Sequence, residues 1–188
     1  MTTTLVLGGA RSGKSAHAER LAAQTGCEVA YIATAHAGDA EMAARIAHHR
    51  EGRPAHWVTV EEPLLLADAI ARHSTPSTVV LVDCITLWLT NLLFSSGHEY
   101  PETGMIDLPP LFGAQRAALL DVLRQPAGDV VLVSNEVGLG IIPLGALSRS
   151  FVDEAGRLNQ ALAAVCDRVL FIAAGLPMVL KGRPCSLV

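Results

Sequence analysis

Short apolar runs alternate along this chain with longer amphipathic stretches. Several of the runs are continuous stretches of Val, Leu and Ile, which is typical of strands in a parallel sheet that helices cover on both faces. The runs that predict strands, of which the last is the weakest, are Thr4–Leu7, Val29–Ala33, His56–Val60, Thr78–Asp83, Asp129–Ser134, Arg168–Ala173 and Met178–Leu180.

Helical periodicity fills the intervals between these strands. The predicted helices are Lys14–Gln24, Asp39–Arg50, Pro63–Arg72, Thr86–Ser95, Leu111–Arg124 and Ser148–Cys166. This alternation predicts an α/β fold with a mostly parallel, doubly wound sheet and right-handed crossovers. We expect one domain over residues 1–188, because the length suits a single compact unit and the irregular segments Ser96–Pro110 and Asn135–Gly145 read as surface loops.

Composition narrows the class of protein. Hydrophobic residues make up 51% of the 188 positions and charged residues 17%, which excludes a disordered chain. The net charge of −4 leaves no basic excess to neutralise phosphates, so we expect no nucleic-acid partner. No apolar run has the length of a membrane span, and the N-terminus has no signal-peptide profile. Four scattered cysteines without a Cys-x-x-Cys pair indicate reduced thiols, so we expect a cytoplasmic protein without membrane insertion.

The strongest motif follows the first predicted strand. Eight consecutive residues fit the phosphate-loop pattern G-x-x-x-x-G-K-[ST] at every fixed position, between an apolar strand and an Ala-rich helix. In such a loop, N–H groups converge on phosphate oxygens, while the lysine bridges the β- and γ-phosphates and the final hydroxyl binds Mg²⁺. The motif predicts binding of a nucleoside triphosphate by Gly8, Gly9, Ala10, Arg11, Ser12, Gly13, Lys14 and Ser15.

A carboxylate at the end of a buried strand supplies a partner for the metal. Asp83 follows Val79–Val82, and the carboxyl end of such a strand faces the ligand crevice of a doubly wound sheet. We therefore predict that Ser15 and Asp83 hold Mg²⁺, although an aspartate after a strand is also common in ordinary turns. Regulatory GTPases recognise guanine with an Asn-Lys-x-Asp segment, which this sequence lacks.

A pair of adjacent histidines lies in the predicted helix Asp39–Arg50. Helical periodicity places Glu41, Arg45 and His48 on one polar face, whereas His49 leans toward the apolar stripe. Adjacent histidines on a helix point in different directions, which argues against a shared metal ion. Spacing alone favours a solvated surface role for His48, yet it also allows this side chain to reach a phosphate beside an arginine.

Seven blocks of the sequence together resemble one enzyme family. They are Gly-Gly-Ala-Arg-Ser-Gly-Lys-Ser at 8–15, Tyr-Ile-Ala-Thr at 31–34, Glu-Met-Ala-Ala-Arg-Ile-Ala-His-His-Arg at 41–50, Gly-Arg-Pro-Ala-His-Trp at 52–57, Asp-Cys-Ile-Thr-Leu-Trp-Leu-Thr-Asn-Leu at 83–92, Ser-Asn-Glu-Val-Gly-Leu-Gly-Ile-Ile-Pro at 134–143 and Ala-Gly-Arg-Leu-Asn-Gln-Ala-Leu-Ala at 155–163. The chain resembles the bifunctional adenosylcobinamide kinase/adenosylcobinamide-phosphate guanylyltransferases of cobalamin biosynthesis. The blocks at 41–57 and 134–143 are far more specific than the phosphate loop.

This resemblance implies a RecA-like P-loop fold, a homotrimer and two reactions. The first phosphorylates the hydroxyl group of adenosylcobinamide with ATP or GTP. The second transfers GMP from GTP to that phosphate, through a guanylylated histidine, and gives adenosylcobinamide-GDP and pyrophosphate. By motif position this histidine is His48, with Lys14 as the second catalytic residue. A kinase without the histidine intermediate is the main alternative, and a non-catalytic nucleotide-binding regulator is a third.

Matching motif positions also implies further nucleotide contacts. These are Thr34, Ala35, His36, His49, Arg50, Glu51, Gly52, Glu61 and Asp83. Glu61 is preferred over its neighbour Glu62, and Arg45 or Arg50 is a candidate for neutralising phosphate charge. The matching assigns no individual role to Asn135, Glu136, Arg157 and Asn159; helix packing or a subunit interface suits the last two as well as a role in the site does.

Overall fold

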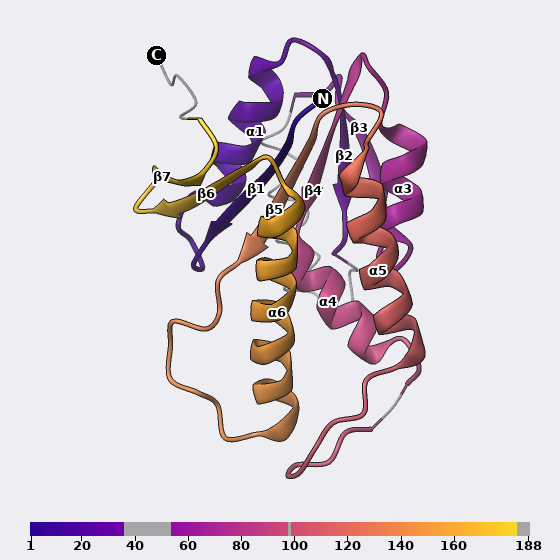
Figure 1. The fold of residues 1–188 in the computed structure, drawn as a ribbon, viewed down its shortest axis with the longest axis vertical. Coiled ribbons are helices and arrows are strands. Elements are labelled where there is room, and N and C mark those ends of the chain that lie inside the picture. The colour runs from indigo at the N-terminus through magenta and orange to yellow at the C-terminus, as the bar shows by residue number, and fades with distance from the viewer. Residues whose placement is uncertain (36–53, 98, 184–188) are drawn as a thin grey trace.

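The computed structural model describes residues 1–35, 54–97 and 99–183, and its centre is a seven-stranded sheet (Figure 1). The strand order is β3-β2-β4-β5-β1-β6-β7. The first six strands along the chain are parallel, and β7 pairs antiparallel with β6 at one edge of the sheet. The strands are β1 (Thr3–Gly8), β2 (Glu28–Ala33), β3 (Val58–Glu61), β4 (Thr78–Asp83), β5 (Val130–Asn135), β6 (Arg168–Ala173) and β7 (Leu176–Lys181).

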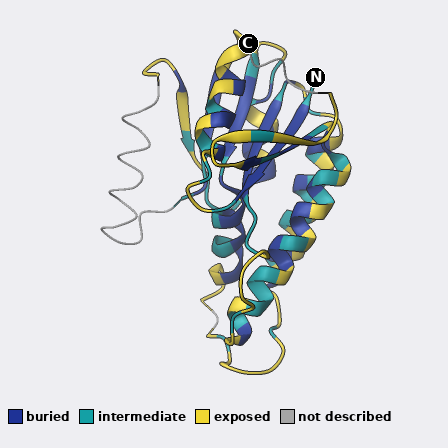
Figure 2. Ribbon diagram, turned by 90° about the vertical axis from the view of Figure 1, so that its left-hand side faces the viewer, coloured by how far each residue is buried: buried dark blue, intermediate teal, exposed yellow. Residues whose placement is uncertain are grey.

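Helices pack on both faces of the sheet and bury its central strands, which are the dark ribbons in Figure 2. Because side chains alternate along a strand, Leu5 and Leu7 join the core on one face, whereas Val6 joins the core on the other. The face of Val6 is covered by α1 (Lys14–Gln24). The opposite face is covered by α3 (Leu66–His73), α4 (Ile85–Phe94), α5 (Pro110–Arg124) and α6 (Ala146–Val165). The predicted α/β architecture is therefore confirmed.

Two predicted elements begin two or three residues later than expected. The strand predicted over His56–Val60 spans Val58–Glu61, because the Trp57 amide donates to the Pro54 carbonyl oxygen (3.1 Å) and closes a turn there. The helix predicted from Pro63 begins at Leu66, after a turn that the Glu62 carboxylate holds. The predicted helix Asp39–Arg50 lies outside the described residues.

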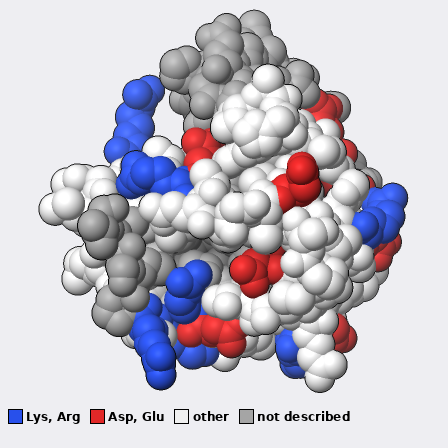
Figure 3. All heavy atoms as spheres, turned by 90° about the horizontal axis from the view of Figure 1, so that it is seen from above, with Lys and Arg blue, Asp and Glu red and all other residues white. Residues whose placement is uncertain are grey.

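The surface charges, the helix lengths and the cysteine thiols do not narrow the class of protein further. On the face seen in Figure 3, small groups of acidic and basic side chains are interspersed among neutral areas. Within the described residues, no helix combines the length and apolarity that crossing a membrane requires. Cys84 and Cys166 are buried and Cys27 is exposed, and all three carry free thiols.

The parallel strands bring several polar residues to one edge of the sheet. β1, β4 and β5 end with Gly8, Asp83 and Asn135, and β5 lies between the other two. Gly8 is in register with Asn135, and Asp83 is in register with Val133. The carboxyl edge of this sheet therefore places the phosphate loop, Asn135 and Asp83 beside one another, which is where ligands bind in open α/β sheets.

Candidate nucleotide-binding site

The phosphate loop curls tightly between β1 and α1. Arg11 (φ 55°) and Gly13 (φ 92°) both adopt left-handed backbone conformations. The Ser12 amide donates to the Gly9 carbonyl oxygen (3.3 Å), and the His17 amide donates to that of Gly13 (3.0 Å). Alternation of left- and right-handed residues turns successive N–H groups toward one concave surface, which favours the binding of anions.

The side chains of the loop fit a phosphate ligand. Lys14 is only 9% exposed, and its Nζ donates to the Gly9 carbonyl oxygen at 3.2 Å, so the ammonium group is held over the loop. Ser12 Oγ is buried without a hydrogen-bond partner. Ser15, half-buried in the first turn of α1, adds a hydroxyl at the positive end of the helix dipole.

Neighbouring segments brace the loop from two sides. The Gly175 amide, in the turn between β6 and β7, donates to the Ser12 carbonyl oxygen at 2.8 Å. The Glu136 amide donates to the Gly8 carbonyl oxygen at 3.1 Å. A Cβ atom at Gly8 would lie 2.5 Å from Ser12 Oγ and 2.7 Å from the Ile172 carbonyl oxygen, so only glycine fits there.

Asp83 and Lys14 act on the same buried thiol. Burial raises the pKa of Cys84, the negative charge of Asp83 raises it further, and the positive charge of Lys14 opposes the shift. Asp83 and Lys14 therefore both lie within electrostatic reach of Cys84. A carboxylate at this position and the Ser15 hydroxyl are the hard oxygen donors that Mg²⁺ prefers, so these two residues fit the predicted metal.

The Thr34 side chain forms its hydrogen bonds with the protein backbone. Its side chain is fully buried; Oγ1 donates to the Cys84 carbonyl oxygen (2.7 Å) and accepts from the Cys84 amide (2.9 Å). The Thr34 carbonyl oxygen accepts a third bond from Asn91 Nδ2 (2.7 Å). The hydroxyl of this predicted nucleotide contact thus ties the ends of β2 and β4 together, and half-buried Ala35 follows it at the same edge.

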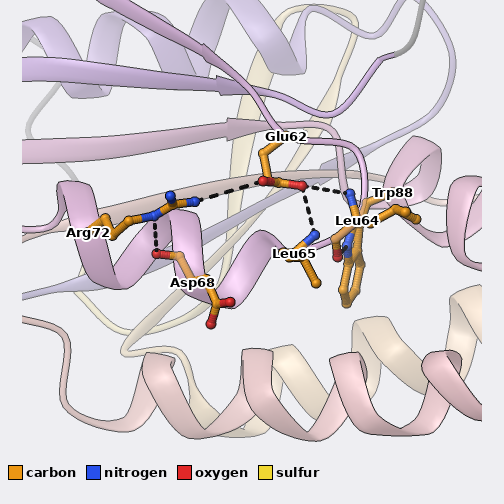
Figure 4. Close-up of polar contacts among 6 residues, drawn as sticks. All are labelled: Glu62, Leu64, Leu65, Asp68, Arg72 and Trp88. Atoms are coloured by element: carbon orange, nitrogen blue, oxygen red, sulfur yellow. Dashed lines mark hydrogen bonds and ion pairs between the residues drawn. The ribbon is translucent and has the colours of Figure 1, made fainter.

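The two glutamates after β3 differ in their surroundings. Glu62 Oε1 accepts the amides of Leu64 (3.1 Å) and Leu65 (2.8 Å), and its Oε2 lies 3.9 Å from Arg72 (Figure 4). Glu62 thus holds the turn that leads into α3. Glu61 is exposed at the carboxyl end of β3, in register with Ala33, and its contact with a nucleotide stays a prediction.

Several predicted contacts stay predictions. His36, His48, His49, Arg50, Glu51 and Gly52 lie outside the described residues, as does Arg45. The flanking described residues are Ala35, which follows the carboxyl end of β2, and Pro54, which precedes β3.

The sequence alone assigned no role to a polar network beside the loop. It joins the end of β5 to α4 and α6 through Ser134, Asn135, Thr86 and Asn159. Thr86 lies in the block at 83–92 that carries part of the resemblance, but its partner Asn135 is 49 residues away along the chain. Arg157 pairs with Glu154 one turn earlier on α6, and Glu154 also binds Arg116 of α5.

Fold and phosphate-loop motif together define a protein with a RecA-like P-loop fold. A model of the family described as cobinamide kinase/cobinamide phosphate guanyltransferase matches residues 4–180. The chain belongs to this family.

Named relatives support the family, and a solved structure supports the fold. The chain is 56% identical over 180 residues to the bifunctional adenosylcobalamin biosynthesis protein CobP of Pseudomonas aeruginosa, covering 96% of this chain and 98% of the relative. It is 45% identical over 179 residues to CobU of Escherichia coli K12, covering 94% and 98%. Among solved structures, a type III secretion ATPase superposes with a TM-score of 0.53 at 11% identity, over 95% of this chain and 56% of the ATPase, which supports the fold alone.

Proposed function

We propose that this chain phosphorylates the hydroxyl group of adenosylcobinamide with ATP or GTP, and then transfers GMP from GTP onto that phosphate. The observation that supports this most directly is that the phosphate loop and Asp83 share one edge of the sheet in a chain of this family. In the first reaction the substrate oxygen bonds to the γ-phosphorus, the bond from that phosphorus to the β-phosphate oxygen breaks, the nucleoside diphosphate leaves, and the hydroxyl proton is released to solvent. Lys14 and the amides of the loop neutralise the charge on the phosphates.

Mg²⁺ is the proposed cofactor, held by Ser15 and Asp83 together with phosphate oxygens. When bound, the ion neutralises phosphate charge. The chain itself contributes the fixed loop amides, the buried Lys14 ammonium and the dipole of α1.

The second reaction proceeds through His48. A neutral imidazole is a competent nucleophile near pH 7 because its unperturbed pKa is about 6.5. Its nitrogen attacks the α-phosphorus of GTP, a P–N bond forms, and pyrophosphate departs. A phosphate oxygen of adenosylcobinamide phosphate then attacks the same phosphorus and breaks the P–N bond, which yields adenosylcobinamide-GDP.

The fold supports this role for the segment that carries His48. Residue 35 follows the carboxyl end of β2, and Thr34 binds the backbone beside Asp83. Ala35, the last described residue before His48, therefore lies at the same edge of the sheet as the phosphate loop.

Labelling with GTP tests the intermediate. Incubation with GTP radiolabelled at the α-phosphate, followed by mass spectrometry, should reveal one GMP adduct on His48 that is acid-labile and alkali-stable. His48→Ala should abolish the label. His73→Ala is the matched control, because His73 ends α3 and lies outside the proposed machinery. Phosphorylation of cobinamide without any protein label would establish the kinase-only alternative.

The proposed assembly is a homotrimer. An exposed apolar loop after β5 supports self-association: the exposed fractions of Leu139, Ile141, Ile142 and Leu144 range from 71% to 99%. Exposed apolar surface of this kind is typical of surfaces that a partner covers.

A further inference from the structure

We propose that Asn135 is a catalytic residue of the phosphorylation step, whose side-chain carbonyl oxygen accepts a hydrogen bond from the substrate hydroxyl group. This inference rests on the kinase activity proposed above but not on the histidine intermediate. It begins with the place of Asn135 in the sheet. Asn135 is the last residue of β5, the strand between the phosphate-loop strand β1 and the Asp83 strand β4.

Strand alternation sets the face to which Asn135 belongs. Val131 and Val133 pack in the core beneath α1, whereas Ser134 points to α6 and donates to Asn159 Oδ1 at 2.7 Å. Asn135, two residues after Val133, therefore lies on the face that also carries α1 and Lys14. Its Nδ2 is 4.0 Å from Sγ of Cys84, the residue that follows Asp83. Asn135 is also in register with Gly8, the first residue of the phosphate loop, so the amide lies between the loop and the end of β4.

The network fixes the orientation of this amide. Asn135 Nδ2 donates to Thr86 Oγ1 at 2.7 Å, and the Thr86 hydroxyl forms a hydrogen bond of 3.2 Å with Cys84 Sγ. Asn159 Nδ2 donates to the Asn135 backbone carbonyl oxygen at 3.2 Å. Because Thr86 and Asn159 are each only 5% exposed, these bonds form in a setting where water competes little.

The side-chain oxygen of Asn135, Oδ1, determines which kind of group this residue can bind. With Nδ2 bound to Thr86, the side chain offers Oδ1, an acceptor without a proton. Phosphate oxygens are also acceptors, so Oδ1 must face a donor. The phosphorylation step brings one such donor to this place, namely the hydroxyl group that attacks the γ-phosphorus. A fixed acceptor aligns the lone pair of that hydroxyl with the phosphorus, and misplacement by about 1 Å can cost about 100-fold in rate.

Steady-state kinetics of the full-length enzyme test this assignment. With cobinamide and ATP radiolabelled at the γ-phosphate, Asn135→Ala should lower kcat about 10- to 100-fold. The Kd for a fluorescent GTP analogue should stay within about 3-fold of the wild-type value, because no nucleotide contact is lost. Thr86→Val should lower kcat through the misoriented amide, and Thr86→Ser should restore it.

A control variant separates catalysis from stability. Ser134→Ala removes a bond of the same network on the opposite face of the sheet, and we expect a lower Tm with kcat within about 2-fold of wild type. An unchanged kcat in Asn135→Ala would overturn the proposal, as would an equal loss of kcat in Ser134→Ala. Recovery of the Asn135→Ala rate at high Mg²⁺ would also overturn it, because Oδ1 would then face a metal-bound water. Absence of phosphorylation by the wild-type enzyme would instead refute the proposed function.

Discussion

Thr34 and Cys84 exchange two hydrogen bonds across the ends of β2 and β4. The Thr34 hydroxyl donates to the Cys84 carbonyl oxygen (2.7 Å) and accepts from the Cys84 amide (2.9 Å), and both residues are buried. One side chain thus satisfies both backbone groups of the residue that follows Asp83. The position of Asp83 at the site depends on this reciprocal pair.

Thr34→Val should destabilise the fold by about 2–4 kcal/mol, because each buried backbone group left without a partner costs about 1–3 kcal/mol. Urea denaturation measures the change in the free energy of unfolding. Thr34→Ser, which keeps the hydroxyl, is the control and should retain most of the stability. Equal losses in both variants would show that the methyl group, rather than the hydroxyl, matters.

Two neighbouring glycines in the phosphate loop should respond differently to alanine. Gly8→Ala places a Cβ atom 2.7 Å from the Ile172 backbone, and overpacking of this kind costs about 1–3 kcal/mol. A Cβ atom at Gly9 meets nothing within 4 Å, so Gly9→Ala should unfold at nearly the wild-type temperature. Thermal denaturation of the two variants, with equal Tm values as the contradicting outcome, tests the packing around the loop.

Lys14→Ala should weaken nucleoside triphosphate binding about 10- to 150-fold, because a charge-assisted hydrogen bond contributes about 1.5–3 kcal/mol. Isothermal titration calorimetry with GTP and Mg²⁺ measures the effect. Lys181→Ala removes the same charge from an exposed position, where Nζ binds the Ala163 and Ala164 carbonyl oxygens at the end of α6. An affinity loss of similar size in that control would indicate a general charge effect.

The stability of the fold should fall in mild acid because of His17. This side chain is fully buried, its Nδ1 lies 3.3 Å from Arg20, and burial followed by the Arg20 charge lowers its pKa. As the pH falls below about 6.5, the unfolded chain binds a proton that the folded chain resists, so the free energy of unfolding decreases until the pH reaches the lowered pKa. His17→Gln should remove this dependence between pH 7.5 and 5.5, measured by urea denaturation. Parallel pH profiles would refute the role of His17.

The apolar loop after β5 allows a direct test of the proposed trimer. Ile141 is 99% exposed in the single chain, and Ile141→Glu should place a charge where a second copy packs. Sedimentation velocity should then show a shift from trimer to monomer without loss of secondary structure. A variant that sediments like the wild type would place the interface elsewhere.

Much of the fold follows from local patterns. The limits of β4, β6 and α1 agree with the prediction because continuous apolar runs and the phosphate-loop motif mark them clearly. The start of α3 was wrong, because the bonds from Glu62 to Leu64 and Leu65 create a turn that periodicity does not reveal.

Less of the candidate site than of the fold could be predicted from the sequence. Local spacing predicted the phosphate loop, and strand position predicted a role for Asp83. The bonds from Asn135 to Thr86 and from Thr34 to Cys84 join residues 49 and 50 positions apart, so only the folded sheet brings them together. For the same reason, a motif match could not show that the Thr34 hydroxyl is used by the backbone.

The turn between β6 and β7 makes the phosphate loop sensitive to substitutions near the C-terminus. Its Gly175 amide donates to the Ser12 carbonyl oxygen, so segments from opposite ends of the chain meet at the phosphate loop. A substitution in the hairpin of β6 and β7, which carries none of the motifs described above, should therefore lower the affinity for the nucleotide. Screens for inactive variants should accordingly find a cluster there that resembles defects of the N-terminal loop.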